Sequence, residues 1–198
     1  MGLRERKAAR TRQLLLDTGY RLFVEQGYEQ TTMEQIASEA EVGASTLYRY
    51  FPTKDLLLLD QLTTWMDVAD QLSERPDGEP LPEALAAAIR SSLEAIEDVE
   101  RFAAVRAMVD DSPPARARLL DILIRSRADL EAVVAERLGR SPDELDVALI
   151  SAVAFRVWEL VGDRWWTNDH QGSPGAILDE VLRTLARTSV PYPALSAQ

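Results

Sequence analysis

The stretch from Thr31 to Lys54 constrains the fold of this chain more than any other part of its sequence. Thr32 is followed three residues later by Gln35, the spacing of a capping box at the start of a helix. The turn 41–43 separates this short helix from a second one, which Pro52 ends because the residue before a proline is pushed out of helical geometry. Two short helices joined by a tight turn are typical of a helix-turn-helix, which places its second helix in the major groove of DNA.

Apolar residues recur at helical spacing along the rest of the chain, and no segment alternates convincingly with period two. Gly27 and Gly139 each follow such a pattern at a position where glycine commonly ends a helix, and Thr53 and Ser141 are placed to cap others. We therefore predict an all-α protein with about nine helices. Their expected ranges are 7–26, 33–40, 44–51, 54–72, 82–97, 99–109, 112–138, 142–166 and 174–188.

The composition argues against several classes of protein. The chain has no cysteine, which excludes disulfides and thiolate metal sites, and no apolar run approaches the roughly 18 residues of a membrane span. No apolar signal segment follows the charged N-terminus. The only histidine, His170, lies in a polar loop, and we find neither a catalytic set nor a phosphate-cradling glycine motif. We expect a soluble, cytoplasmic protein that is not an enzyme and uses no metal or cofactor.

The net charge of −11 is unevenly divided along the chain, with +1 over residues 1–54 and −12 over residues 55–198. The basic residues at the N-terminal end, which face only Glu5, are Arg4, Arg6, Lys7, Arg10 and Arg12. A basic N-terminal segment in an otherwise acidic chain is typical of a protein that binds nucleic-acid phosphate through that segment only. The alternative is a solvated, charged tail with no partner.

The second helix of the helix-turn-helix would present its first turn to the bases. This turn is Ala44, Ser45 and Thr46, whose short side chains favour hydroxyl hydrogen bonds and contacts with thymine methyl groups over bidentate arginine readout. Tyr48 has two interpretations, as a phosphate contact or as part of a small helical core, whereas Leu47 and Phe51 are expected in the core under both.

Residues 7–60 resemble the N-terminal domain of the TetR family of bacterial transcriptional regulators. Three segments show the resemblance: the end of the first helix (residues 22–23 and 27–28), residues 31–37, and residues 46–54. It implies a homodimer with a three-helix DNA-binding domain (residues 1–54) and a helical domain that binds a small molecule and dimerises (residues 55–198). The DNA-contact positions that it implies are Thr32, Met33, Ala44, Ser45, Thr46, Tyr48, Tyr50 and Lys54.

The chain departs from the family pattern at two positions of the turn. Glu41 stands where the family often has glycine, and Gly43 where it often has a serine cap. We expect Glu41 to occupy a strained or altered turn, because a non-glycine residue with positive φ is uncommon. Gly43 is a weaker cap than serine.

Large apolar and aromatic residues with interspersed arginines mark the expected effector site in the second part of the chain. The candidates are Trp65, Met66, Phe102, Val105, Arg106, Phe155, Trp158 and Trp165. Such a site suits an amphipathic anion, for example a fatty-acyl molecule, whereas the alternative is an ordinary core with its salt bridges. Residues 113–138 are similar to actinobacterial TetR regulators akin to the mycofactocin-system regulator, some of which respond to acyl-CoA.

The last two expected helices carry apolar residues at three- and four-residue steps, as a four-helix bundle between two copies would require. These residues are Leu145, Leu149, Val153, Val157, Leu160, Val161, Ile177, Val181, Leu182 and Leu185. The alternative is that they belong to the core within one chain, as some of them must. The sequence therefore predicts a ligand-responsive dimeric repressor that binds double-stranded operator DNA with palindromic symmetry. The alternative is a helical small-molecule carrier without DNA function.

Overall fold

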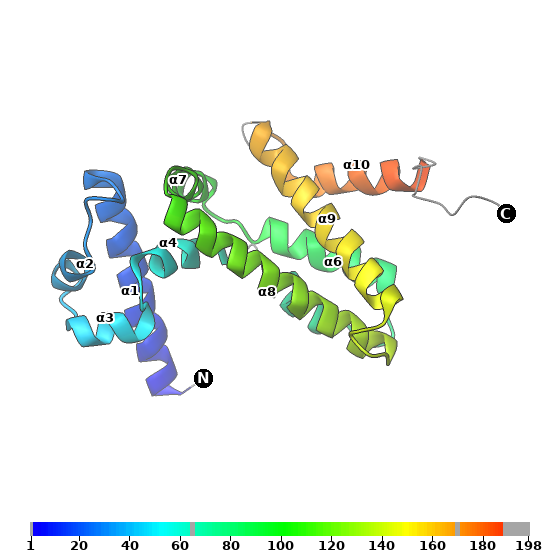
Figure 1. Ribbon diagram of the computed structural model, residues 1–198, viewed down its shortest axis with the longest axis horizontal. Coiled ribbons are helices and arrows are strands. Elements are labelled where there is room, and N and C mark those ends of the chain that lie inside the picture. Colours follow the sequence, from blue (N-terminus) through cyan, green and yellow to red (C-terminus); the bar gives the residue numbers. More distant parts are fainter. Residues whose placement is uncertain (1, 64–65, 169–170, 188–198) are drawn as a thin grey trace. The chain divides into compact units, whose positions relative to one another are not determined.

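The computed structural model describes residues 2–63, 66–168 and 171–187, a range that leaves out the candidate Trp65 and the loop residue His170. All regular secondary structure in these residues is helical, which confirms the all-α prediction. The helices are α1 (Leu3–Gln26), α2 (Met33–Glu39), α3 (Ala44–Tyr50), α4 (Lys54–Thr63), α5 (Val68–Ser73), α6 (Leu81–Glu94), α7 (Val99–Asp111), α8 (Pro113–Leu138), α9 (Leu145–Thr167) and α10 (Pro174–Arg187) (Figure 1).

The chain forms two compact units. The N-terminal unit contains the described residues up to 67 together with residues 96–126, and the C-terminal unit contains residues 68–95 and the described residues from 127 onward. Helix α8 therefore contributes to both units. The functional division at residue 54 remains a prediction.

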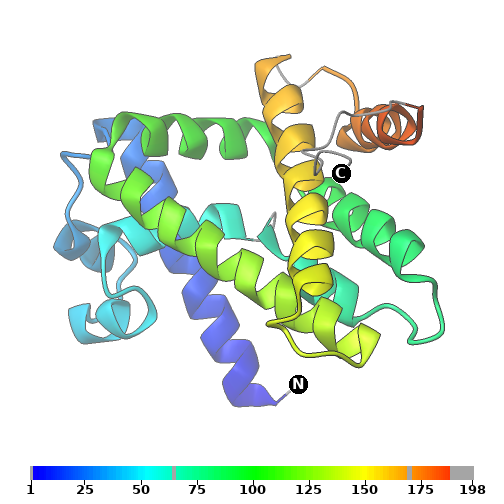
Figure 2. The same cartoon turned by 45° about the vertical axis from the view of Figure 1, so that its right-hand side comes forward.

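The N-terminal unit is built around α1, which packs on α2 and α4, while α3 packs on α2 and α7 on α4 (Figures 1 and 2). Fully buried side chains of its core include Leu15, Phe23, Ile36 and Leu47. Helix α1 approaches α4 closely at Gly19, where an added Cβ would lie 2.5 Å from Leu57 Cδ2. The absence of a side chain at Gly19 therefore allows α1 to pack closely on α4.

The C-terminal unit packs α6 against α5, α9 and α10, and α9 against α10. Both views show α6 beside α9 (Figures 1 and 2). Trp158 of α9 is 1% exposed and stacks at a tilt on Phe155, with 5.1 Å between the ring centroids. The indole N–H of Trp165 donates to the carbonyl of Gly172 at 3.2 Å, a bond that joins α9 to residue 172.

Several helix boundaries differ from the expected ones by one to four residues. Helix α1 begins at Leu3, so the basic residues at 4, 6 and 7 lie on a helix instead of in a tail. The helix expected over 54–72 is divided into α4 and α5. Glu144 Oε1 accepts the backbone N–H of Ser141 at 3.0 Å as in a capping box, but residues 141–144 form a turn and α9 begins at Leu145.

Candidate nucleic-acid interface

Helix α2 begins with the predicted capping box. The backbone N–H of Gln35 donates to Thr32 Oγ1 at 3.2 Å, and Gln35 Oε1 accepts the backbone N–H of Thr32 at 2.8 Å. Ile36 and Ala37 anchor this helix, since both are almost fully buried. The capping box confirms the sequence prediction and fixes where α2 starts.

The turn between α2 and α3 is a Schellman motif with an unusual residue at its left-handed position. The N–H of Val42 donates to the carbonyl of Ala37 at 2.9 Å, and that of Glu41 to the carbonyl of Ser38 at 3.1 Å. Glu41 has a φ of 54°, and it is the only non-glycine residue with positive φ in the described part of the chain. The expected altered turn is therefore present, with Glu41 in the left-handed position that glycine usually occupies in this motif.

Helix α3 follows Gly43, an extended residue that provides no side-chain cap. Leu47 and Phe51 are 0% and 2% exposed, which confirms both as core. Ala44 and Ser45 are exposed, and Thr46 is half-buried. The first turn of α3 is thus open to a partner.

Tyr48 lies on the surface of α3 with 42% of its area exposed, so it does not belong to the core. Its hydroxyl donates to Glu34 Oε1 of α2 at 2.8 Å. This hydrogen bond lowers the pKa of Glu34 and raises the pKa of Tyr48. The bond joins the two helices of the motif and holds a carboxylate beside the surface that would face DNA.

The basic residues of α1 have different surroundings. Arg4, Arg6 and Lys7 are exposed on its first turns. Arg12 instead forms an ion pair with Asp60 of α4, and its guanidinium lies over the Phe51 ring at 5.5 Å from the centroid. Burial raises the pKa of Asp60, and the nearby Arg12 opposes that rise. Arg12 therefore stabilises the packing of α1 on α4, and the first turns of α1 hold the exposed charge.

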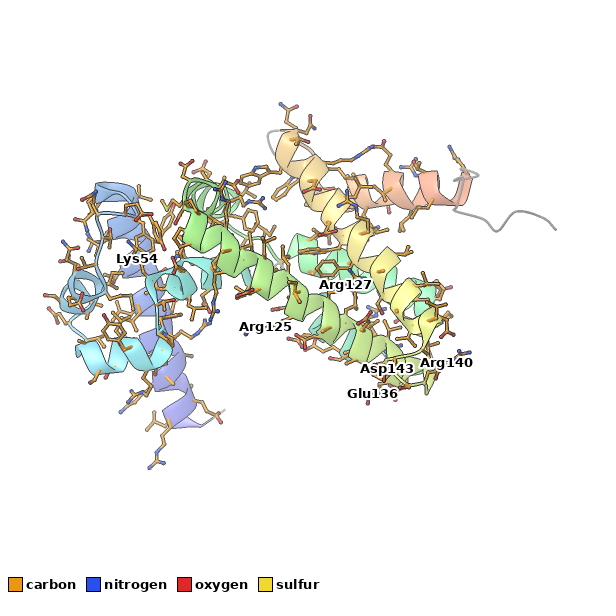
Figure 3. The ribbon with its side chains drawn as sticks, viewed as in Figure 1. Lys54, Arg125, Arg127, Glu136, Arg140 and Asp143 are labelled. Atoms are coloured by element: carbon orange, nitrogen blue, oxygen red, sulfur yellow. The ribbon has the colours of Figure 1, made fainter. Side chains whose placement is uncertain are left out.

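Two further residues that were predicted to contact DNA interact with other parts of the protein. Met33 is 7% exposed and belongs to the core. The ammonium of Lys54, labelled in Figure 3, donates to backbone carbonyls between α1 and α2. Sequence reasoning did not single out Arg49, an exposed residue of α3 whose guanidinium lies 5.8 Å from the Tyr50 ring centroid. The positive charge of Arg49 on the second helix of the motif could have identified it as a candidate phosphate contact.

Comparisons with known proteins agree with this geometry. Residues 15–60 match the model of the bacterial regulatory proteins of the tetR family. The HTH-type transcriptional regulator TcmR of Streptomyces glaucescens is 33% identical over 175 residues, which are 83% of this chain and 77% of that protein. This chain belongs to the TetR family.

More local similarity extends to the HTH-type transcriptional repressor KstR of Rhodococcus jostii, with 37% identity over 67 residues, 34% of this chain and 32% of KstR. Among solved structures, FadR of Bacillus subtilis in complex with stearoyl-CoA has a TM-score of 0.58 and 22% identity, covering 88% of this chain and 97% of FadR. FadR of Bacillus halodurans has a TM-score of 0.60 and 21% identity, covering 91% of this chain and 96% of its own. These likenesses extend the shared fold over both units.

The protein is therefore a TetR-family DNA-binding transcriptional regulator. Its relatives are regulators of transcription, and no catalytic family is indicated. Within the ranges that the structure describes, no helix of this TetR-family chain has the length and apolarity needed to cross a membrane.

The residues predicted to bind an effector are distributed over both units of this TetR-family chain. Met66, Phe102 and Val105 are buried in the N-terminal unit, whereas Phe155, Trp158 and Trp165 are buried on α9 in the C-terminal unit. Arg106 Nε contacts both carboxylate oxygens of Asp110 at 3.2 Å. Their burial fits both the core and the effector interpretation, so their role as ligand contacts remains a prediction.

The C-terminal unit has an apolar hollow of about 430 Å³ between α6, α9 and α10. Its lining includes Leu81, Leu85, Ile89, Leu149, Val153, Val157, Leu182 and Leu185. Three α9 residues on this side are strongly exposed, with 75% of Leu145, 58% of Leu149 and 56% of Val153 accessible. The α9–α10 face is thus unusually apolar for a surface in contact with water.

Proposed function

We propose that this protein is a ligand-responsive dimeric repressor whose two helix-turn-helix motifs bind a palindromic operator. The observation that carries the proposal is the open first turn of α3, together with the exposed basic turns of α1, in a chain whose remainder is acidic. Because two-fold related recognition helices must lie about one DNA turn apart, the two copies would read two half-sites.

The proposed base contacts are Ala44, Ser45 and Thr46 of α3. Tyr50 and Arg49 would contact phosphate from the same helix, and Arg4, Arg6 and Lys7 from α1. Tyr48 would do so by exchanging its hydrogen bond to Glu34 for one to phosphate. Thr32 would contribute its hydroxyl hydrogen, which remains available because its oxygen is the acceptor in the capping box. Met33 and Lys54 support the motif from within.

The proposed dimer forms through the α9–α10 face. The exposed leucine and valine residues of α9 and Leu185 of α10, which is 42% exposed, support it because a second copy would remove them from water. The hollow between α6, α9 and α10 borders these residues and would receive side chains of the partner copy.

The proposed effector is an amphipathic acyl-type molecule. FadR of Bacillus subtilis, which shares the fold at 22% identity, was solved in complex with stearoyl-CoA. The effector would act by binding two conformations of the dimer with different affinity, because a ligand that binds both equally does not change the equilibrium between them.

DNA binding is tested by selecting bound duplexes from a random-sequence library with the full-length protein. Recovery of a palindromic sequence, bound with an affinity that falls steeply with salt, supports the regulator. If the selection returns no enriched sequence under low-salt conditions, the proposed operator recognition is refuted.

The dimer is tested by Leu149→Glu, with Leu120→Glu as the matched control because Leu120 of α8 is 60% exposed, close to the 58% of Leu149. Sedimentation should give a dimer for the wild type and the control and a monomer for Leu149→Glu. An unchanged dimer in Leu149→Glu contradicts the assigned face.

The effector is tested by titrating stearoyl-CoA, and coenzyme A alone, into the complex with the selected duplex. Release of DNA by the acyl thioester alone supports an acyl effector. If neither compound binds or changes DNA affinity, the acyl hypothesis is abandoned while the regulator remains.

A further inference from the structure

Lys54, the first residue of α4, is surrounded by backbone oxygen atoms of the loop that joins α1 to α2. Its Nζ donates to the carbonyls of Tyr28 at 2.7 Å, Thr31 at 3.1 Å and Glu29 at 3.3 Å. The same Nζ lies 4.3 Å from the Tyr28 ring centroid, in a cation–π arrangement. An ammonium has three N–H donors, so all of them are used within the protein.

The loop that Lys54 holds is tied to both of its neighbouring helices. Thr31 is 1% exposed, and its hydroxyl donates to the carbonyl of Gly27 at 2.9 Å. Gln26 of α1 donates through Nε2 to Thr31 Oγ1 at 3.1 Å. A second tie to α4 comes from Tyr28, whose hydroxyl donates to Asp55. The loop is thus held from both α1 and α4.

This arrangement determines where α2 begins, because the residue after Thr31 is the helix cap Thr32. Helix α2 in turn carries Glu34, which accepts the hydroxyl of Tyr48 from α3. A chain of contacts therefore runs from Lys54 through the loop to α2 and on to the exposed face of α3. All of these residues belong to the N-terminal unit.

We propose that Lys54 is a positioning residue, which uses its ammonium to hold the α1–α2 loop and thereby the reading orientation of α2 and α3, instead of contacting DNA phosphate. The inference rests on the proposed DNA contacts of α3. A contact with phosphate would require Lys54 to give up at least one of its three charge-assisted hydrogen bonds to these carbonyls in a half-buried site.

The substitution Lys54→Arg distinguishes the positioning role from phosphate binding, because the two roles make different demands on the side chain. Three carbonyl oxygens lie within 3.3 Å of one nitrogen atom, which a tetrahedral ammonium satisfies. No nitrogen of a planar guanidinium has more than two hydrogens, so arginine cannot reproduce the arrangement. Arginine is, however, at least as good a phosphate ligand as lysine. Lys54→Arg should therefore behave like Lys54→Met if the residue positions the loop, and like the wild type if it binds phosphate.

The chain contains only two lysines, Lys7 and Lys54, which provides a matched control. Lys7 is exposed on α1 and is one of the proposed phosphate contacts. We would measure the affinity of each arginine and methionine variant for the selected duplex and for a random-sequence duplex across salt concentrations. Lys7→Met should lower the salt slope by about one, and Lys7→Arg should leave it unchanged.

For Lys54 we expect both variants to bind the selected duplex about tenfold more weakly, with the affinity for the random duplex and the salt slope unchanged. Wild-type affinity in Lys54→Arg, together with a slope lowered by about one in Lys54→Met, would overturn the positioning role. Melting curves establish that each variant is folded before its affinity is compared.

A measurement on the wild type covers the case in which Lys54 variants do not fold. Acetylation of the two lysines, followed by mass spectrometry, should label Lys7 at least about tenfold faster than Lys54 in the free protein, since the ammonium held by three carbonyls must first be released. Adding DNA should slow the labelling of Lys7 only. Equal rates in the free protein, or protection of Lys54 by DNA, would refute the proposal. The labelling of free protein needs no DNA, so its result stands apart from a failure to select an operator.

Discussion

The substitution Glu41→Gly should stabilise the protein, although it removes a side chain and makes the chain more flexible. Glu41 has a φ of 54° in the Schellman turn between α2 and α3. A residue with a Cβ is disfavoured there by about 1–2 kcal/mol relative to glycine. The greater freedom of glycine in the unfolded chain offsets about 0.5–1 kcal/mol of that gain. The net expectation is an increase of about 1 kcal/mol in the free energy of unfolding.

The chain contains its own reciprocal control at the end of α8. Gly139 has a φ of 63°, and the turn has the same two hydrogen bonds, from Arg140 N to the carbonyl of Ala135 at 2.9 Å and from Gly139 N to that of Glu136 at 3.0 Å. A Cβ at Gly139 would meet no atom within 4 Å, so Gly139→Ala tests the backbone alone. It should lose about as much stability as Glu41→Gly gains.

The assay is denaturant unfolding followed by circular dichroism, supported by thermal melts, in which about 1 kcal/mol corresponds to a shift of about 2–4 °C for a chain of this length. Glu41→Ala removes the charge but keeps the Cβ, and it should change stability by less than about 0.5 kcal/mol. If Glu41→Gly is neutral or destabilising while Gly139→Ala is destabilising, the side chain of Glu41 supports the turn in a way that the backbone argument omits, and the reasoning is refuted.

Three other substitutions have definite expected outcomes. Gly19→Ala should destabilise by about 1–3 kcal/mol in denaturant unfolding, because the added Cβ would lie 2.5 Å from Leu57 Cδ2; a gain of the kind that alanine brings at exposed helix positions would contradict this packing. Burial raises the pKa of Asp60 in the folded state, so its contribution to stability is present below the unfolded pKa of about 3.9 and is lost as pH rises through the folded pKa. The stability of the wild type relative to Asp60→Asn should therefore fall as pH increases above about 4, and a pH-independent difference in unfolding free energy would exclude this linkage. Tyr48→Phe should weaken binding to the selected duplex about three- to tenfold without changing the salt slope, because a neutral hydroxyl is lost, and unchanged affinity would remove Tyr48 from the interface.

The helix-turn-helix was predictable from sequence because its determinants are local. The capping pair Thr32 and Gln35 are three residues apart, and the positive φ of Glu41 followed from its place in a turn that favours glycine. The same local logic was wrong about the start of α9, since the 141–144 segment forms the hydrogen bond expected between Ser141 and Glu144 without continuing as a helix.

The role of Lys54 could not be predicted in this way. Its partners are backbone carbonyls 23 to 26 residues earlier, and every residue has a carbonyl, so no side-chain pattern marks them. The expected effector residues show a related limit, because a pattern of buried aromatic residues is the same whether they surround a ligand or one another. Trp158 illustrates it, as its burial and its contact with Phe155 satisfy an ordinary core.

The positions of the aromatic residues also give the protein an intrinsic fluorescent probe. All four tryptophans follow residue 64, whereas four of the five tyrosines precede residue 51. Trp158 and Trp165 lie in the C-terminal unit, the first in its core and the second bonded to a loop carbonyl. Fluorescence excited selectively in tryptophan therefore originates outside the helix-turn-helix. A change in that emission on adding DNA would be a signal transmitted through the protein, and it can be recorded without attaching any dye.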